Sequence, residues 1–459
     1  MEENGFARSL REFMKISDHS KIREFCETGH AASVADFVSV LAPAEIWQLL
    51  QYASSKRRAE IFSHLREDIQ LLILEELKRG EVARLLSEMP PDDRADLFRR
   101  LPPEWGESIL PALAQAERED IRRLASYEEG TAGSVMTSDY ATASPDFTAS
   151  ETITHLRTIA PDKETVYYTF VVDENRKLLG LVTLKDLIIA RPDARVGRIM
   201  NTDIVSVKVD DDQEDAARLI QKYDLLALPV VDEEGSLVGI ITHDDVLDII
   251  TQEQTEDIEK LMAIGGRHES AAYIRTPALI HFKNRAGWIV ALAVLGMVSG
   301  FLVQRFEDLL LEFSILAAFM PMVADTGGNT GSQSATLVIR ALALREVTPG
   351  DIFRILWKEA KVAIMIGIML GILTFGRVVL FGAGATAPTG YPLERIGLAI
   401  ALAISLQVVS ATLFGAILPM AAARLKLDPA VVASPALTTV VDITGLFIFF
   451  TTANVILGL

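Results

Sequence analysis

The chain has 459 residues, half of them hydrophobic, and its mean hydropathy of +0.28 is too high for an ordinary soluble enzyme. A net charge of −18 argues against nucleic acid as a partner, because such a surface repels phosphate. The single cysteine, Cys26, excludes a disulfide framework within the chain and a cysteine-rich metal site.

The charge is unevenly distributed along the chain. Residues 1–271 contain 31 Lys and Arg against 52 Asp and Glu, a net of −21, whereas residues 272–459 contain 13 against 10. The first residues, MEENGFARSL, are acidic and lack an apolar stretch, so we expect no signal peptide and a cytoplasmic N-terminal part. An acidic soluble part joined to a nearly neutral membrane part favours multivalent cations as partners.

The N-terminal part, residues 1–130, contains short helical patterns separated by proline turns. The stretches RRAEIFSHL, from Arg57, and DRADLFRRL, from Asp93, share a core pattern 36 residues apart. Each places its apolar residues on one helix face at spacings of three and four. A repeat of this period predicts stacked helical hairpins, that is, an all-α superhelical domain.

Residues 131–255 contain a second repeat. FVVDENRKLLGLVTLKDLI, from Phe170, matches PVVDEEGSLVGIITHDDVL, from Pro229, with equivalent positions 59 residues apart. Each copy indicates a strand, a turn, a second strand and a helix. The pair resembles tandem α/β CBS domains, which usually sense adenine nucleotides or ions. The resemblance implies an ATP pocket with Asp186 and Tyr168, and Asp245 stands at the position equivalent to Asp186.

A charged connecting helix is expected at residues 256–275, followed by an all-α transmembrane domain at residues 276–459. Five spans are expected, roughly at 287–306, 313–344, 357–385, 397–425 and 431–459, each longer than the ~20 residues that cross a bilayer. Lys and Arg are more frequent in the loops on the side of the N-terminus. This bias predicts a cytoplasmic N-terminus and an extracytoplasmic C-terminus.

The second expected span carries unusual chemistry for a membrane helix. It reads FMPMVADTGGNTGSQSATLVIRALAL, and Asp325, Asn329 and Gln333 recur every four residues as one polar stripe. Freed carbonyls and polar side chains at this depth are typical of a water-filled path. Helix packing through small residues is the alternative explanation for the glycines.

The fifth expected span carries an isolated acid, Asp442, on the same helix face as Ser434, Thr438 and Gly445. Acids within membrane spans usually face a pathway, so we expect an ion site here, with a protonated structural aspartate as the alternative. Oxygen ligands of this kind suit Mg²⁺, Ca²⁺ or Mn²⁺. One carboxylate per subunit is sparse, and a two-fold axis would bring two together.

The whole chain resembles the MgtE family of magnesium channels, in domain order and in the stretches GGNTGSQSATLVIRAL and LDPAVVASPALTTVVDITG. The resemblance implies a homodimer in the cytoplasmic (inner) membrane that conducts Mg²⁺ and closes when intracellular Mg²⁺ binds the acidic domains. It implies pore residues Asp442, Thr438, Gly445, Asn329 and Ser434. The regulatory residues that it implies are Glu60, Asp92, Asp96, Glu214, Asp224, Asp245, Asp248, Glu253, Glu256 and Asp257, and for any single one a solvated surface acid is the alternative.

Two other functions remain open from the residues themselves. One is a secondary transporter of another divalent cation or of an ion-coupled solute, which predicts inverted repeats. The other is a membrane-bound Mg²⁺ or nucleotide sensor without transport, which leaves the polar stripe and Asp442 unexplained. An enzyme is not expected, because no nucleophile and base stand out together.

Overall fold

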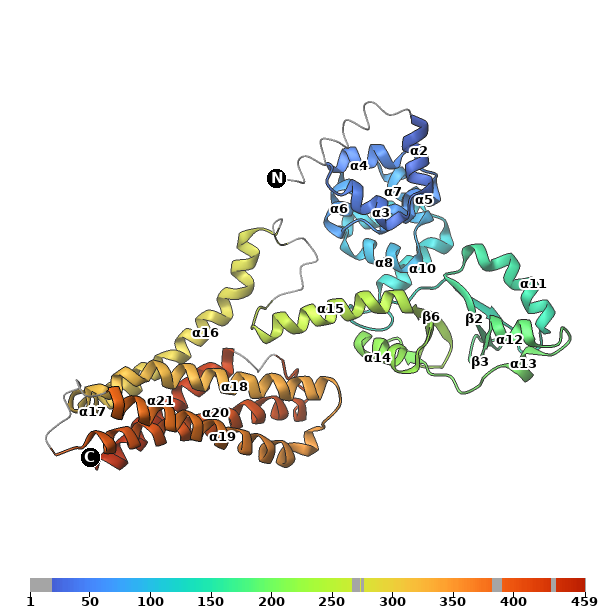
Figure 1. Ribbon diagram of the computed structural model, residues 1–459. Coiled ribbons are helices and arrows are strands. Elements are labelled where there is room, and N and C mark those ends of the chain that lie inside the picture. Colours follow the sequence, from blue (N-terminus) through green and yellow to red (C-terminus); the bar gives the residue numbers. More distant parts are fainter. Residues whose placement is uncertain (1–18, 266–272, 274–275, 382–389, 431–434, 459) are drawn as a thin grey trace. The chain divides into compact units, whose positions relative to one another are not determined.

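The computed structural model describes residues 19–265, 273, 276–381, 390–430 and 435–458 (Figure 1). The chain divides into two compact units, which are described separately below. The first contains Met1–Glu253 with Glu269–Arg275, and the second contains Gln254–His268 with Thr276–Leu459.

The first unit begins with a stack of short helices, as the repeat predicts. Their common core includes Phe62, Ile73 and Leu86, all fully buried. Several of these helices begin with proline. In α8, Asp92 and Asp93 occupy the first turn, where negative charge interacts favourably with the helix dipole. The helices are α2 (His19–Thr28), α3 (Ala31–Val38), α4 (Pro43–Leu50), α5 (Ser55–Ser63), α6 (Glu67–Glu76), α7 (Arg79–Glu88), α8 (Pro91–Arg100), α9 (Pro103–Ile109), η1 (Leu110–Ala112) and α10 (Gln115–Ala125).

The rest of the first unit contains two equivalent α/β modules, as the second repeat predicts. Their sheets have the orders β1-β2-β3 and β4-β5-β6, in each of which the first pair is parallel and the second antiparallel. The first module contains β1 (Tyr140–Ala143), α11 (Ala149–Ile159), η2 (Ala160–Asp162), β2 (Thr165–Val172), β3 (Leu178–Thr183), α12 (Leu184–Ile189) and α13 (Val196–Ile199). The second contains β4 (Val207–Lys208), α14 (Gln213–Tyr223), β5 (Ala227–Val231), β6 (Leu237–Thr242) and the start of α15 (His243–Leu261).

Helix α15 continues through residue 256, where the connecting helix was expected to begin. It begins at His243 and continues without a break to Leu261, because no glycine or proline interrupts this stretch. The helix that closes the second α/β module and the expected connecting helix are therefore one element. Residues 266–272 and 274–275 of the expected segment lie outside the described residues.

Within the part of the second unit that the structure describes, four helices are long and apolar enough to cross a membrane: Ala278–Arg305, Pro349–Leu380, Leu393–Arg424 and Ala436–Leu457. A fifth long helix, α18 (Met320–Ala343), has 24 residues and packs against α20 and α21, but its Gly, Thr, Ser and Asn lower its hydropathy. The elements are α16 (Ala278–Arg305), α17 (Glu307–Glu312), η3 (Ser314–Phe319), α18, η4 (Pro349–Asp351), α19 (Ile352–Phe381), α20 (Leu393–Arg424) and α21 (Pro435–Leu457).

Small residues let these helices approach closely. A Cβ on Gly415 of α20 would overlap the carbonyl oxygen of Gly331 of α18, and one on Gly367 of α19 would lie 3.1 Å from the carbonyl oxygen of Ser405. Close backbone contact of this kind is a usual basis of helix association in lipid. The close contact of Gly415 with Gly331 supports helix packing as the explanation for Gly331. Helix packing does not explain the polar residues beside it.

Candidate functional site

The polar stripe of α18 lies on the exposed side of that helix. Asp325, Asn329 and Gln333 are all exposed, whereas Gly327 and Gly331 on the neighbouring face are buried against α20 and α21. The Nδ2 of Asn329 donates to Oδ1 of Asp325 over 3.1 Å, so the two side chains form one polar surface. Such a surface is costly against hydrocarbon, and it therefore points to water or to another subunit.

Helix α21 brings the predicted acid close to this stripe. A Cβ on Gly328 would lie 3.5 Å from Cγ2 of Thr438, so the turn that contains Asn329 packs beside Thr438. Asp442, one turn further along α21, is half-buried. Gly445 lies one turn beyond and contacts the side chain of Gln407 in α20. The structure thus brings Asn329, Thr438, Asp442 and Gly445 into one region, and Ser434 lies outside the described residues.

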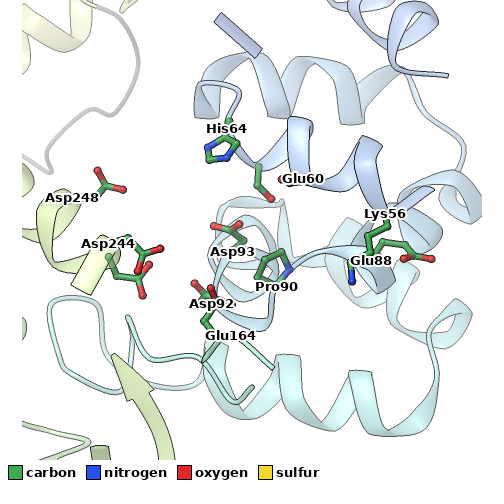
Figure 2. A pocket seen from close by; sticks show the side chains of 12 residues that line it. Lys56, Glu60, His64, Glu88, Pro90, Asp92, Asp93, Glu164, Asp244 and Asp248 are labelled. Atoms are coloured by element: carbon green, nitrogen blue, oxygen red, sulfur yellow. The ribbon is translucent and has the colours of Figure 1, made fainter. Parts of the chain in front are cut away.

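A second candidate site is an acidic cavity in the first unit, of about 440 Å³. Figure 2 shows Asp92 and Asp93 of α8 and Asp244 and Asp248 of α15 facing the same space. Eight carboxylates line it against one lysine and one histidine. The lining residues are Lys56, Glu60, Ser63, His64, Glu88, Pro90, Asp92, Asp93, Glu164, Asp244, Asp245 and Asp248.

The surroundings of this cavity disfavour the ionised form of its carboxyl groups. Burial, followed by the charges of Asp93, Asp245 and Glu164, raises the pKa of Asp92 well above its ordinary value. Burial, with the charges of Asp244 and Glu164, raises the pKa of Asp245 to about 7, although Thr242 donates to its carboxylate. Oδ1 of Asp92 is buried and has no hydrogen-bond partner among the described residues. A cation would compensate for each of these features.

The carboxylates of the cavity do not form a preformed cage. Among the described residues, no three His, Cys, Asp or Glu side chains are grouped closely enough to ligate one metal ion directly. Mg²⁺ sheds its waters reluctantly and is commonly held by one or two carboxylates and several waters. The cavity therefore fits a hydrated divalent cation better than a dehydrated one.

The cavity contains four of the ten predicted regulatory residues, namely Glu60, Asp92, Asp245 and Asp248. It also contains carboxylates that were not predicted: Glu88, Asp93, Glu164 and Asp244. Asp93 and Asp244 each stand next to a predicted aspartate, so the doubled acids PDD and HDD were an available signal. Nothing in the local sequence marks Glu164, which enters the cavity from the start of β2.

The remaining predicted regulatory residues lie elsewhere, several with partners of their own. Asp96 forms an ion pair with Arg99. Glu214 pairs with Arg218, and Asp224 is exposed at the end of α14 in a left-handed conformation with φ of 51°. Glu253 accepts a hydrogen bond from Gln213. These contacts tie acids to their own α/β module or helix.

The end of α15 lies in the second unit and is anchored there by an ion pair. Nζ of Lys260 lies 2.9 Å from Oε1 of Glu256 and 3.0 Å from Oδ2 of Asp428, in the loop between α20 and α21. Leu261 packs on the cluster of Ala335, Ala411, Leu437 and Val441. Asp257 is exposed on the same helix. The end of α15 thus contacts the membrane helices that carry the polar stripe and Asp442.

The two predicted nucleotide residues are neighbours. Tyr168 of β2 pairs in register with Thr183 of β3, and the Thr183 hydroxyl donates to Oδ2 of Asp186 over 2.6 Å. Thr242 and Asp245 make the same contact in the second module, where the aspartate faces the acidic cavity instead. The repeat therefore places one motif in two different surroundings.

An acidic cavity between helical and α/β domains, on a chain that also has a bundle of long apolar helices with an aspartate among them, is typical of one class of protein, the regulated membrane transporters of cations. Family models match three parts of the chain: a divalent cation transporter domain at residues 320–452, an MgtE intracellular N domain at 29–130, and CBS domains at 132–193 and 196–252. The chain is 38% identical to the magnesium transporter MgtE of Thermus thermophilus, over all of this chain and 99% of that one. It is 31% identical to that of Bacillus subtilis, over 91% and 93% of the two chains. The chain belongs to the MgtE family.

Solved structures resemble the first part of the chain. The cytosolic domain of the Mg²⁺ channel MgtE in complex with ATP matches 53% of this chain and 99% of that one, with 39% identity and a TM-score of 0.50. The soluble part of a magnesium transporter matches 55% and 99%, with 33% identity and a TM-score of 0.51. The expected multidomain fold, with a helical N domain, tandem CBS domains and a helical C-terminal region, is confirmed.

Proposed function

We propose that this chain is a Mg²⁺-selective channel or transporter that closes when intracellular Mg²⁺ binds its acidic cavity. The observation that supports this most is the exposed stripe of Asp325, Asn329 and Gln333 beside the half-buried Asp442. Polar groups on a helix of a membrane bundle cost free energy unless they line a water-filled path or a subunit interface. Curated relatives over the full length are named magnesium transporters, which favours the first use.

The ion path is proposed to lie on the axis of a homodimer. One Asp442 per subunit is too little charge to select a divalent cation, and a two-fold axis pairs each residue with its copy. Two carboxylates attract a hydrated cation and exclude anions. Asn329, Thr438, Gly445 and Ser434 then contribute amide, hydroxyl and carbonyl oxygens around the hydrated ion, which suit Mg²⁺.

We place the protein in the cytoplasmic (inner) membrane with five spans. Four helices of the described residues are long and apolar enough to span a membrane, and α18 supplies the fifth span because it packs within the same bundle. An odd number of spans puts the two termini on opposite sides. The excess of Lys and Arg on the side of the N-terminus then predicts a cytoplasmic N-terminus and an extracytoplasmic C-terminus.

Gating is proposed to act through α15. Mg²⁺ in the acidic cavity neutralises carboxylates from α5, α7, α8 and α15 and that of Glu164, just before β2, and so holds these elements together. The same helix ends at the ion pair of Lys260 with Asp428, next to α20 and α21. A ligand shifts such an equilibrium only by binding one state better than the other, and the like charges of the cavity supply that difference.

The first CBS module is proposed to bind an adenine nucleotide through Tyr168 and Asp186. The related cytosolic domain was solved in complex with ATP. Asp186 is exposed, and its carboxylate is oriented by Thr183 at the start of α12. ATP would act here as a regulatory ligand, and we assign the chain no catalytic reaction.

The pore assignment is tested by Mg²⁺ uptake into proteoliposomes that contain Asp442→Asn. The substitution keeps size and removes the charge pair, so we expect flux to fall to the level of empty vesicles while the dimer remains intact. Asp308→Asn, at the start of α17 and outside the long helices, is the matched control and is expected to conduct. Near-parental flux through Asp442→Asn would refute the assignment.

A further inference from the structure

Gln407 is a buried polar residue in the middle of α20 that no predicted function uses. It is 0% exposed, and both its amide nitrogen and its amide oxygen lack a hydrogen-bond partner among the described residues. A buried amide without a partner is destabilising, because it has lost the hydrogen bonds that it makes with water in the unfolded chain. Leucine would fill the same length at no such cost, so the space around Gln407 calls for a polar explanation.

The Gln407 side chain lies between two glycines of the helices that form the candidate ion path. A Cβ on Gly327 of α18 would overlap its amide nitrogen. A Cβ on Gly445 of α21 would lie 2.9 Å from the same nitrogen and 3.0 Å from Cγ. The absence of a side chain at both positions is what admits the glutamine.

These two glycines stand on the turns that carry the acids of the path. Gly327 follows Asp325 by two residues on α18, and Gly445 follows Asp442 by three residues on α21. Gln407 therefore contacts, from the side of α20, the backbone of the two turns that carry Asp325 and Asp442. Together with Val441 of α21, which also lies against Gly327, the Gln407 side chain sets how closely α18 and α21 approach each other at this level.

We propose that Gln407 is a positioning residue that fixes the spacing between the polar stripe of α18 and Asp442, and thereby the discrimination between Mg²⁺ and larger divalent cations. The inference rests on the proposed ion path. Hydrated Mg²⁺ keeps its waters in a near-ideal octahedron at 2.0–2.1 Å, whereas Ca²⁺ has a larger and more flexible shell at 2.3–2.6 Å, so a site of fixed width distinguishes the two hydrated ions. Loss of a fixed spacing therefore reduces selectivity more than it reduces flux.

The amide adds a polar anchor to this steric role. In a site of low dielectric, its N–H and C=O dipoles interact with the backbone of the glycine-containing turns beside them more strongly than they would in bulk solvent. Gln407→Leu removes this anchor and keeps the length of the side chain. Gln407→Asn keeps the amide and shortens its reach by one methylene.

The test compares Mg²⁺ and Ca²⁺ flux in proteoliposomes of the full-length protein. We expect Gln407→Leu to lower the Mg²⁺/Ca²⁺ flux ratio about fivefold, which corresponds to about 1 kcal/mol, and Gln407→Asn to lower it less. Thr412→Val is the matched control, because Thr412 is buried on the same helix and its hydroxyl donates to the carbonyl oxygen of Val408 of that helix, over 2.8 Å. An unchanged ratio in Gln407→Leu would overturn the inference.

A second comparison remains informative if Gln407→Leu does not fold. Gly445→Ala introduces a Cβ against Gln407, so we expect it to lower the Mg²⁺/Ca²⁺ ratio, and Gln407→Ala in the same chain removes the opposing atoms and restores part of it. An equal defect in the single and double variants would contradict the role of Gln407. If Asp442→Asn also conducts normally, the path itself is wrong; if Asp442→Asn is inactive, only the positioning role fails.

Discussion

Proton binding should compete with Mg²⁺ binding in the acidic cavity, and the effect can be worked out for Asp245. Burial, with Asp244 and Glu164 nearby, raises the pKa of Asp245 to about 7. Other titratable groups that line the cavity are Lys56, Glu60, His64, Glu88, Asp92, Asp93 and Asp248. A proton on Asp245 must leave before that carboxylate can attract a divalent cation.

The raised pKa of Asp245 determines how stability and Mg²⁺ affinity change with pH. The folded unit holds the proton more tightly than the unfolded chain, so this contribution to stability is fully present below pH 4 or so and is lost as the pH rises through about 7. Without Mg²⁺ the unit therefore loosens with rising pH. If one proton of pKa near 7 is displaced, apparent Mg²⁺ affinity rises about tenfold between pH 6 and 8.

Limited proteolysis of the full-length protein measures this coupling. The Mg²⁺ concentration that gives half-maximal protection of residues 19–253 should fall about tenfold from pH 6 to pH 8 in the parent. In Asp245→Asn it should change much less, because the titrating group is absent. Asp186→Asn, the equivalent residue of the first module, should behave as the parent. The same pH dependence in Asp245→Asn and the parent would refute the reasoning.

Two further predictions concern the second unit. Lys260→Met removes the ion pair with Asp428, so the Mg²⁺ concentration that inhibits half of the flux should rise a few-fold, as expected for the ~1 kcal/mol of a partly exposed ion pair. Lys358→Met is the control. Equal inhibition of the two variants would show that Lys260 has no role in gating. Gly415→Ala places a Cβ against the carbonyl of Gly331 and should lower the free energy of unfolding in detergent by about 1–3 kcal/mol, whereas Gly376→Ala, with open space around it, should leave melting unchanged.

Features with a local signature could be predicted from the sequence. The repeat of 59 residues corresponds to two CBS modules whose Thr183–Asp186 and Thr242–Asp245 contacts are equivalent. The spacing of four between Asp325, Asn329 and Gln333 placed them on one helix face, and the structure shows that face exposed. Both patterns follow from the geometry of a single element, which the residues of that element determine.

Features that depend on the approach of distant elements could not be predicted from local patterns. The acidic cavity joins Glu60, Asp92, Glu164 and Asp245, which lie up to 185 residues apart. The family resemblance indicated three of these acids, but no local pattern showed that they line one cavity, and Glu164 was missed. Gln407 was not predicted for the same reason. A single glutamine in an apolar helix gives no signal of a role, and its contacts with Gly327 and Gly445 of two other helices are seen only in the structure.

The central claim is that one chain carries a pore and a separate Mg²⁺ sensor. Patch recordings with increasing cytoplasmic Mg²⁺ test it most directly, in the parent and in the triple variant Asp92→Asn, Asp245→Asn and Asp248→Asn. We expect the variant to conduct at Mg²⁺ concentrations that silence the parent, with unchanged selectivity among cations, because the neutralised cavity no longer binds Mg²⁺ better in the closed state. Full inhibition of the triple variant at the parental Mg²⁺ concentration would contradict the claim.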